Sequence, residues 1–131
     1  MIDHFNLPVT DLGRSRRFYA EILAPLGYAF LMQDGDAIGF GTDSWHFGLI
    51  ATPPPFPTLH VAFQAPSRAA VHQFFEAALT VGGRPNGEPG LRPHYHPDYY
   101  AAFVLDPDGH NLEAVHRGRV LSNTRLERPR E

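Results

Sequence analysis

The amino-acid sequence predicts an α+β fold built as two tandem modules, each with one helix packed on several strands. Three observations lead to this prediction. Two amphipathic helical segments, each preceded by a polar capping residue, alternate with short apolar strands. A proline-rich segment, 53–57, divides the chain into halves of similar size. One shift of 56 residues, from His4 to His60, superimposes features of the first half on those of the second.

The first half begins with a strand over residues 2–9. Asp11 then has the position of a helix N-cap, and an apolar stripe at four-residue spacing follows it, made of Phe18, Ile22 and Leu26. Pro25 and Gly27 are expected to end this helix. Three strands are predicted next, over residues 28–32, 37–41 and 45–51.

The second half repeats this order with a strand over 59–64 and a helix capped by Ser67. Residues 84–97 are rich in proline and glycine, and we expect a long loop there. Two strands follow, over 99–105 and 111–116, joined by a turn at 106–109. We expect one domain over residues 1–116, with module one at about 1–52, the connector at 53–57, module two at about 58–116, and a polar tail at 117–131.

The two halves share a register and not only a composition. His4 precedes Phe18 by 14 residues, as His60 precedes Phe74. The distance from His4 to Gly27 is 23 residues, as is the distance from His60 to Gly83. Two unrelated amphipathic helices could match in their apolar positions alone. The matched histidine and glycine favour an internal duplication.

Composition excludes several classes of function. The 131 residues include no Cys and no Lys, which excludes disulfides, thiolate metal sites, cysteine nucleophiles and lysine Schiff bases. The net charge of −3 argues against nucleic acid as the main partner. No apolar run reaches the roughly 18 residues that span a membrane, and the N-terminus lacks the features of a signal peptide, so we expect a cytoplasmic protein. The eight histidines are the unusual feature.

Strand periodicity places two of these histidines and one glutamate on equivalent faces of their strands. His4, His60 and Glu113 each lie on the strand face opposite the face predicted to pack on a helix. Two histidines and one carboxylate form a ligand set that leaves about three positions open on an octahedral ion. Open positions are what a catalytic metal requires, whereas structural sites are usually closed. The alternative is that each is an ordinary hydrogen-bonded strand residue.

The segments around these residues resemble a known group of proteins. Ile2-Asp3-His4-Phe5, Leu59-His60-Val61-Ala62-Phe63 and Asp106-Pro107-Asp108-Gly109-His110-Asn111-Leu112-Glu113 are similar to the vicinal oxygen chelate superfamily of glyoxalases, bleomycin-resistance proteins and extradiol dioxygenases. The resemblance covers about residues 2–116. It implies two βαβββ modules whose curled mixed sheet surrounds a cleft, with the helices outside. It also implies one divalent ion per site, Fe, Mn, Ni or Zn, held by His4, His60 and Glu113, on which adjacent substrate oxygens chelate.

One position departs from part of this group. Glyoxalase I and methylmalonyl-CoA epimerase have a fourth ligand, Glu or Gln, on the last strand of the first module. Aligning residues 47–50 with 112–115 puts Gly48 at that position. Glycine has no side chain that can bind a metal, so this chain resembles the three-ligand members instead.

Further candidate residues surround the predicted cleft. Histidine and tyrosine can carry protons or steady developing charge, and residues 94–100 concentrate both types. As catalytic candidates we select His96, Tyr95, Tyr99 and Tyr100. As substrate-binding candidates we select Trp45, His46, Arg92, His94, Gln64 and Asn6. The alternative for the loop residues is that their rings only pack.

These observations predict a metal-dependent enzyme acting on a small oxygenated substrate, with dioxygenase, lyase or isomerase, or thiol transferase chemistry open. The alternative is a metal-free, ligand-sequestering protein of the bleomycin-resistance type. The resemblance also implies a homodimer, in which the metal site can be shared between chains. Neither a nucleic acid nor a membrane is an expected partner.

Overall fold

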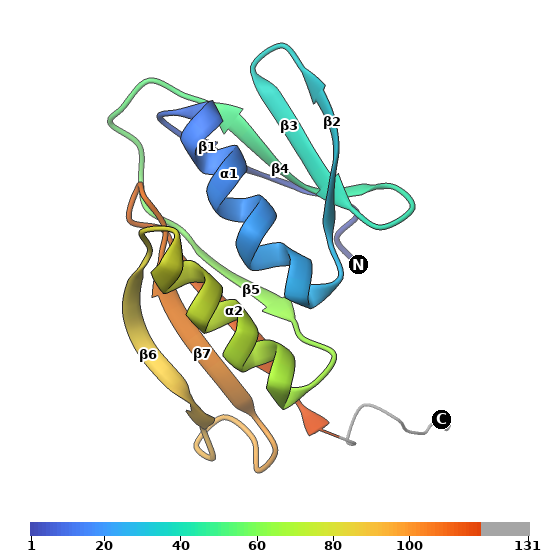
Figure 1. Ribbon diagram of the computed structural model, residues 1–131, viewed down its shortest axis with the longest axis vertical. Coiled ribbons are helices and arrows are strands. Elements are labelled where there is room, and N and C mark those ends of the chain that lie inside the picture. The colour runs from blue at the N-terminus through green and yellow to red at the C-terminus, as the bar shows by residue number, and fades with distance from the viewer. Residues whose placement is uncertain (119–131) are drawn as a thin grey trace.

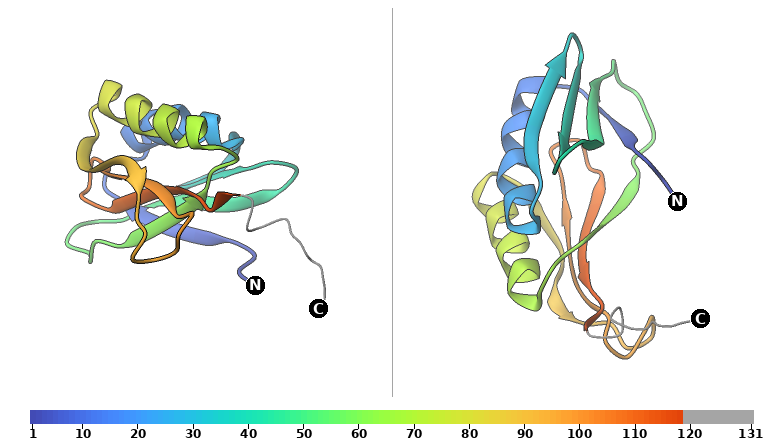
Figure 2. Two further views of the ribbon diagram at one scale, coloured as in Figure 1. Left: turned by 90° about the horizontal axis from the view of Figure 1, so that it is seen from below. Right: turned by 90° about the vertical axis from the view of Figure 1, so that its right-hand side faces the viewer.

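The computed structural model describes residues 1–118, which form a layer of two helices against a layer of two four-stranded sheets (Figures 1 and 2). Both helices lie side by side on the same face of the sheets. The elements in chain order are β1 (Phe5–Val9), α1 (Leu12–Leu23), the 3-10 turn η1 (Ala24–Leu26), β2 (Ala29–Asp34), β3 (Ala37–Gly41), β4 (Trp45–Ala51), β5 (His60–Gln64), α2 (Arg68–Thr80), β6 (Arg84–Leu91), β7 (Tyr100–Leu105) and β8 (Asn111–His116).

The two sheets have the same topology. Their strand orders are β1-β4-β3-β2 and β5-β8-β7-β6. In each sheet the first pair is parallel and the other two pairs are antiparallel. The predicted α+β fold with a duplicated βαβββ pattern is therefore confirmed, and the helices cover one face of the sheets as expected. Within residues 1–118 the opposite face carries no helix, and the predicted ligands His60 and Glu113 lie on that face.

Both helices begin and end where the sequence indicates. The Asp11 carboxylate accepts a hydrogen bond from the backbone N–H of Arg14 at 3.0 Å, and the Ser67 hydroxyl accepts one from Ala70 at 3.0 Å. These bonds satisfy N–H groups that have no partner within the helix. After each helix a glycine takes a left-handed conformation, Gly27 at φ 92° and Gly82 at φ 95°. Other residues adopt that conformation at a cost, so the glycines set the ends of the helices.

The sequence-based prediction for residues 84–91 is wrong, because this segment is strand β6 and not part of a loop. Proline has no N–H to donate, so Pro85 and Pro89 argue against a central strand. They are tolerated because β6 lies at the edge of its sheet and pairs only with β7. The pairing shifts its register on both sides of Gly87. The loop is therefore confined to the residues between β6 and β7.

The two modules share one hydrophobic core. Its buried residues come from both helices and from strands of both sheets. Aromatic rings cross the boundary between modules, with the rings of Phe47 on β4 and Phe63 on β5 in edge contact at 5.1 Å between centroids. Because the helices also pack on each other, the chain is held as one body with both sheets on the same side.

The turn between β7 and β8 forms polar contacts with the first module. Asp106 is 1% exposed and accepts a hydrogen bond at 2.5 Å from the hydroxyl of Tyr19 on α1. Its other oxygen accepts backbone N–H bonds from Asp108 and His110. A buried carboxylate is costly unless it is hydrogen-bonded, and here three donors meet that requirement.

Two more residues of this turn bind the first module. Asp108 accepts hydrogen bonds from the hydroxyl and the backbone N–H of Thr10. The His110 ring is fully buried, accepts the Leu59 N–H at Nδ1 and donates from Nε2 to the Pro8 carbonyl at 2.7 Å. This pair of partners requires neutral imidazole with its proton on Nε2. Segment 106–113, one of the three that carry the family resemblance, thus holds the modules together.

Two further expectations concern regions beyond the sheets. No helix within residues 1–118 is long and apolar enough to cross a membrane. The predicted polar tail, 117–131, lies outside the described residues from position 119 onward.

Replacing Tyr19 by Phe tests the contact between the modules. Loss of the hydroxyl leaves one Asp106 oxygen without its donor, so we expect the free energy of unfolding to fall by about 1.5–3 kcal/mol in urea titrations. Burial, followed by the nearby Asp106 charge, raises the pKa of Tyr19 well above 10.0. The contribution of Tyr19 to the free energy of unfolding is therefore present below pH 10 and decreases as the pH rises further. Tyr19→Phe should lack this decrease in stability at alkaline pH.

Tyr28→Phe is the matched control, because within residues 1–118 the Tyr28 hydroxyl makes no hydrogen bond and its ring only packs on Phe63. Equal effects of the two substitutions would contradict the assigned role of Tyr19.

Candidate functional site

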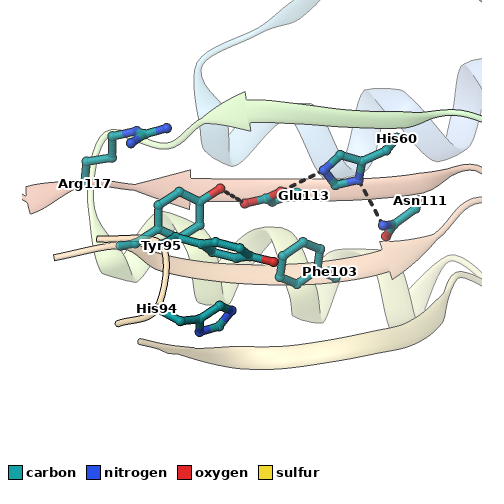
Figure 3. A pocket seen from close by; sticks show the side chains of 8 residues that line it. His60, His94, Tyr95, Phe103, Asn111, Glu113 and Arg117 are labelled. Atoms are coloured by element: carbon teal, nitrogen blue, oxygen red, sulfur yellow. Dashed lines mark hydrogen bonds and ion pairs between the residues drawn. The ribbon is translucent and has the colours of Figure 1, made fainter. Parts of the chain in front are cut away.

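The open face of the second sheet brings together two of the three predicted metal ligands (Figure 3). His60 is the first residue of β5 and Glu113 lies in the middle of the neighbouring strand β8. His60 Nε2 is 3.0 Å from Glu113 Oε1. The His60 side chain is 49% exposed, whereas Glu113 is 3% exposed. The pair therefore combines an accessible imidazole with a carboxylate set into the sheet.

A phenol holds the second oxygen of this carboxylate. Tyr99, just before β7, donates a short hydrogen bond from its hydroxyl to Glu113 Oε2. Burial, with a further contribution from this hydrogen bond, raises the pKa of Tyr99 to about 12. Tyr99 therefore remains a neutral hydrogen-bond donor at physiological pH, and it fixes the orientation of Glu113.

The imidazole is held from its other side by a residue that the sequence analysis did not select. Asn111 contacts His60 Nδ1 at 2.9 Å, and Asn86 in turn donates to the Asn111 side-chain oxygen at 3.0 Å. An amide has both a donor and an acceptor, so Asn111 can serve either tautomer of the ring. The sequence signal that could have identified Asn111 was its position two residues before Glu113, on the same face of the same strand.

These side chains border a cavity of about 700 Å³. Besides His60, Asn111 and Glu113, its lining consists of His94, Tyr95, Tyr99, Phe103 and Arg117. The Arg117 guanidinium lies 5.0 Å from the centre of the Tyr99 ring. The cavity thus has aromatic walls around one buried carboxylate, and besides the predicted ligands His60 and Glu113 it contains three further predicted residues, His94, Tyr95 and Tyr99.

Other loop and strand candidates lie elsewhere. Tyr100 is on the helix side of β7, where its hydroxyl is 2.6 Å from His72 Nε2 on α2. His96 Nδ1 accepts the backbone N–H of Asp98 within the loop. Arg92 donates to the carbonyls of Glu88 and Gly90, and its guanidinium lies 5.4 Å from the centre of the Phe103 ring. The structure therefore does not bring these three to the cavity beside Glu113.

The remaining candidates belong to two further locations. His46 and Gln64 border a second cavity, of about 650 Å³, which His60 also lines and which lies between the modules. His4, Asn6 and Trp45 lie on the open face of the first sheet. There the His4 ring packs on the Trp45 ring at 4.2 Å between centroids. His4 Nδ1 also donates to the Asp3 carboxylate at 2.9 Å, and this hydrogen bond lowers the pKa of Asp3.

Imidazole and carboxylate are residue types that bind divalent ions, so His60 and Glu113 could together hold one. Their donor atoms are hydrogen-bonded at 3.0 Å, close enough for both to reach the same ion. Across residues 1–118, no set of three His, Cys, Asp or Glu side chains gathers closely enough to bind a metal. Within one chain His4 therefore does not complete the predicted set.

Comparisons with known proteins agree with this fold. A family model described as Glyoxalase/Bleomycin resistance protein/Dioxygenase superfamily matches residues 1–114. The uncharacterized protein YqjT of Bacillus subtilis is 31% identical over 127 residues, with 86% of this chain and 95% of that protein covered.

Solved structures show the same fold. A glyoxalase/bleomycin resistance protein from Albidiferax ferrireducens superimposes with a TM-score of 0.78 at 28% identity, covering 87% of this chain and 97% of that one. A putative glyoxalase from Bacillus halodurans has a TM-score of 0.69 at 24% identity, covering 88% and 95%. With the family model matching most of its length, the chain belongs to the Glyoxalase/Bleomycin resistance protein/Dioxygenase superfamily.

Proposed function

We propose that this protein is a divalent-metal-dependent enzyme of the vicinal oxygen chelate type, acting on a small oxygenated substrate. The observation that carries the proposal is the His60–Glu113 pair, whose donor atoms are 3.0 Å apart beside a cavity of about 700 Å³. A surface ion pair would not need a buried carboxylate. This carboxylate is 3% exposed and hydrogen-bonded to Tyr99, as expected of a carboxylate that is oriented to bind a metal.

His4 is the proposed third ligand, supplied by a second copy of the chain. Its Nδ1 is engaged by Asp3, which leaves Nε2 as the nitrogen with a free lone pair in neutral imidazole. The turn at 106–110 holds the two modules of one chain in fixed relation, so His4 has no simple route to Glu113 of its own chain. In a two-fold dimer each module can meet the other module of the partner.

The bound ion would act as a Lewis acid for two adjacent substrate oxygens. The residues of this chain would prepare the site around it. Tyr99 keeps Glu113 oriented, Asn111 keeps His60 oriented, and His94 and Tyr95 offer groups that can hydrogen-bond or exchange protons at the cavity. Oxygenation, a lyase or isomerase step, and thiol transfer all remain compatible with this ligand set, as do Fe, Mn, Ni and Zn.

Metal content tests the proposal directly. Purified protein should carry about one divalent ion per chain by elemental mass spectrometry after reconstitution, because each chain supplies one complete ligand set. Glu113→Ala and the nearly isosteric Glu113→Gln should both lose it. Glu76→Ala, which removes an exposed carboxylate on α2, is the control and should retain the metal.

Full metal content in both Glu113 variants would overturn the proposed site. Absence of metal from the wild type, even after reconstitution, together with tight binding of an aromatic ligand would instead support a sequestering protein.

Mixing two variants that each lack one proposed metal ligand tests whether the site is shared between chains. His4→Ala lacks one ligand, and Glu113→Ala lacks another. If the ligands come from different chains, a mixed dimer keeps one intact site of its two, so random remixing restores about a quarter of the full metal content. If all three ligands belong to one chain, the mixture binds no more metal than the two variants do separately. Sedimentation should show a dimer at micromolar concentration, and a monomer would contradict the shared site.

The two adjacent tyrosines give a matched pair of variants. Tyr99→Phe removes the donor to Glu113 and should weaken metal binding about 10-fold or more, since partners that orient a ligand contribute about 10–100-fold to affinity. Tyr100→Phe removes a hydroxyl that contacts His72 on the helix side, and it should leave metal affinity unchanged. Calorimetric titration with Ni²⁺ measures both, and equal affinities would show that Tyr99 does not orient the ligand.

A further inference from the structure

In the first module a tryptophan occupies the place that Glu113 has in the second. The parallel strand pairs align the two modules, because Asn6 pairs with Gly48 on β1 and β4 as Ala62 pairs with Glu113 on β5 and β8. Gly48 is therefore the structural counterpart of Glu113. It is also the position at which four-ligand relatives are expected to supply their additional ligand.

Two glycines make room for the Trp45 indole at this place. Gly39 on β3 and Gly48 on β4 are cross-strand partners. A Cβ at Gly39 would lie 2.6 Å from Trp45 Cδ1, and a Cβ at Gly48 would lie 2.9 Å from Trp45 Nε1 and closer still to the Asn6 side-chain oxygen. Contacts between carbon atoms normally begin near about 3.5 Å, so any side chain at Gly39 would displace the ring, whereas one at Gly48 would first displace the Asn6 side chain. The indole lies directly against the backbone of the sheet.

The indole in turn supports the proposed ligand His4. The two ring centroids are 4.2 Å apart with an angle of 33° between the planes. Asp3 holds the Nδ1 edge of the imidazole at 2.9 Å, and the Asp3 carbonyl accepts a hydrogen bond from His46 at 3.0 Å. His4 precedes β1 and has no strand partner of its own. Its ring is therefore positioned by Trp45 on one face and Asp3 on one edge.

We propose that Trp45 is a positioning residue for His4, and that it replaces a fourth metal ligand with an aromatic platform. This inference rests on the proposed function. In this arrangement the first module contributes one nitrogen ligand, His4 Nε2, and an apolar ring where a carboxylate would otherwise enter the coordination sphere. Fixing an exposed imidazole before the ion binds reduces the entropy lost on binding, which raises affinity.

A double-mutant cycle separates this role from simple packing. Trp45→Ala should weaken Ni²⁺ binding about 10-fold, the lower range for residues that orient a ligand, whereas Trp45→Phe should retain most of the affinity because a ring still supports His4. In a His4→Ala background the same Trp45→Ala change should have no further effect. An unchanged affinity in Trp45→Ala, or an equal loss with and without His4, would overturn the proposal.

The glycines provide a second route that leaves Trp45 in place. Gly39→Ala, where the added Cβ would meet Trp45 first, should displace the indole and weaken Ni²⁺ binding in the same direction as Trp45→Ala. Gly13→Ala on α1, where the added Cβ would meet only ordinary contacts at 3.7 Å, is the control and should bind as the wild type does. Equal binding by both variants would count against the platform.

Trp45 is the only tryptophan of the chain, so its fluorescence reports on the site. Ni²⁺ has an open shell and quenches a nearby indole, whereas Zn²⁺ has a filled shell and does not. Titration with Ni²⁺ should quench the emission in proportion to occupancy, titration with Zn²⁺ should not, and His4→Ala should lose the Ni²⁺ effect. Saturation by Ni²⁺ without quenching would place the metal away from Trp45 and overturn the inference while leaving the metal site standing. A wild type that binds no metal would overturn both.

Discussion

The buried Asp106 carboxylate is the interaction on which the arrangement of the molecule depends. It belongs to the second module, yet one of its three donors is the Tyr19 hydroxyl of the first. A buried carboxylate without its donors is strongly unfavourable, so the position of α1 is tied to the turn that follows β7. His110 adds a second tie through the Pro8 carbonyl. The two sheets therefore keep a fixed relation, and within residues 1–118 this relation does not bring His4 together with His60 and Glu113 as a set of metal ligands.

Duplication preserved the backbone of the two modules, while the side chains on the open faces diverged. The strand registers correspond, Asn6 with Gly48 and Ala62 with Glu113, because backbone pairing is independent of the side chains there. The second module has a carboxylate at this place, and the first has glycine covered by an indole. In the proposed site, one module thus provides the acidic ligand and the cavity, and the other provides a single imidazole supported by Trp45.

Much of this could be predicted from the sequence because the signals are local. The caps Asp11 and Ser67 and the alternation that places His60 and Glu113 on one face depend only on neighbours along the chain. Strand β6 could not be predicted in this way, because its prolines are acceptable only at a sheet edge, and the order of strands in a sheet depends on long-range pairing. Tyr99 and Tyr100 are adjacent and chemically identical, and only the pleat of β7 decides which hydroxyl meets Glu113. The contact of Trp45 with Gly39 likewise depends on pairing across strands.

The net charge of the proposed site with its metal bound determines which substrates it would attract. The proposed ligands carry one formal negative charge, on Glu113, since ligating histidines are neutral and Tyr99 stays protonated with a pKa of about 12. A divalent ion in that set leaves a net positive centre, and Arg117 adds a further positive charge at the cavity. Glu113 itself is buried, whereas His60 and Arg117 are exposed at the same cavity, so salt screens part of this positive field. It favours substrates or intermediates whose adjacent oxygens carry negative charge, which is the feature shared by oxygenation, isomerisation and thiol-transfer reactions on chelated substrates. The aromatic walls, rather than the metal ligands, are then left to distinguish among them.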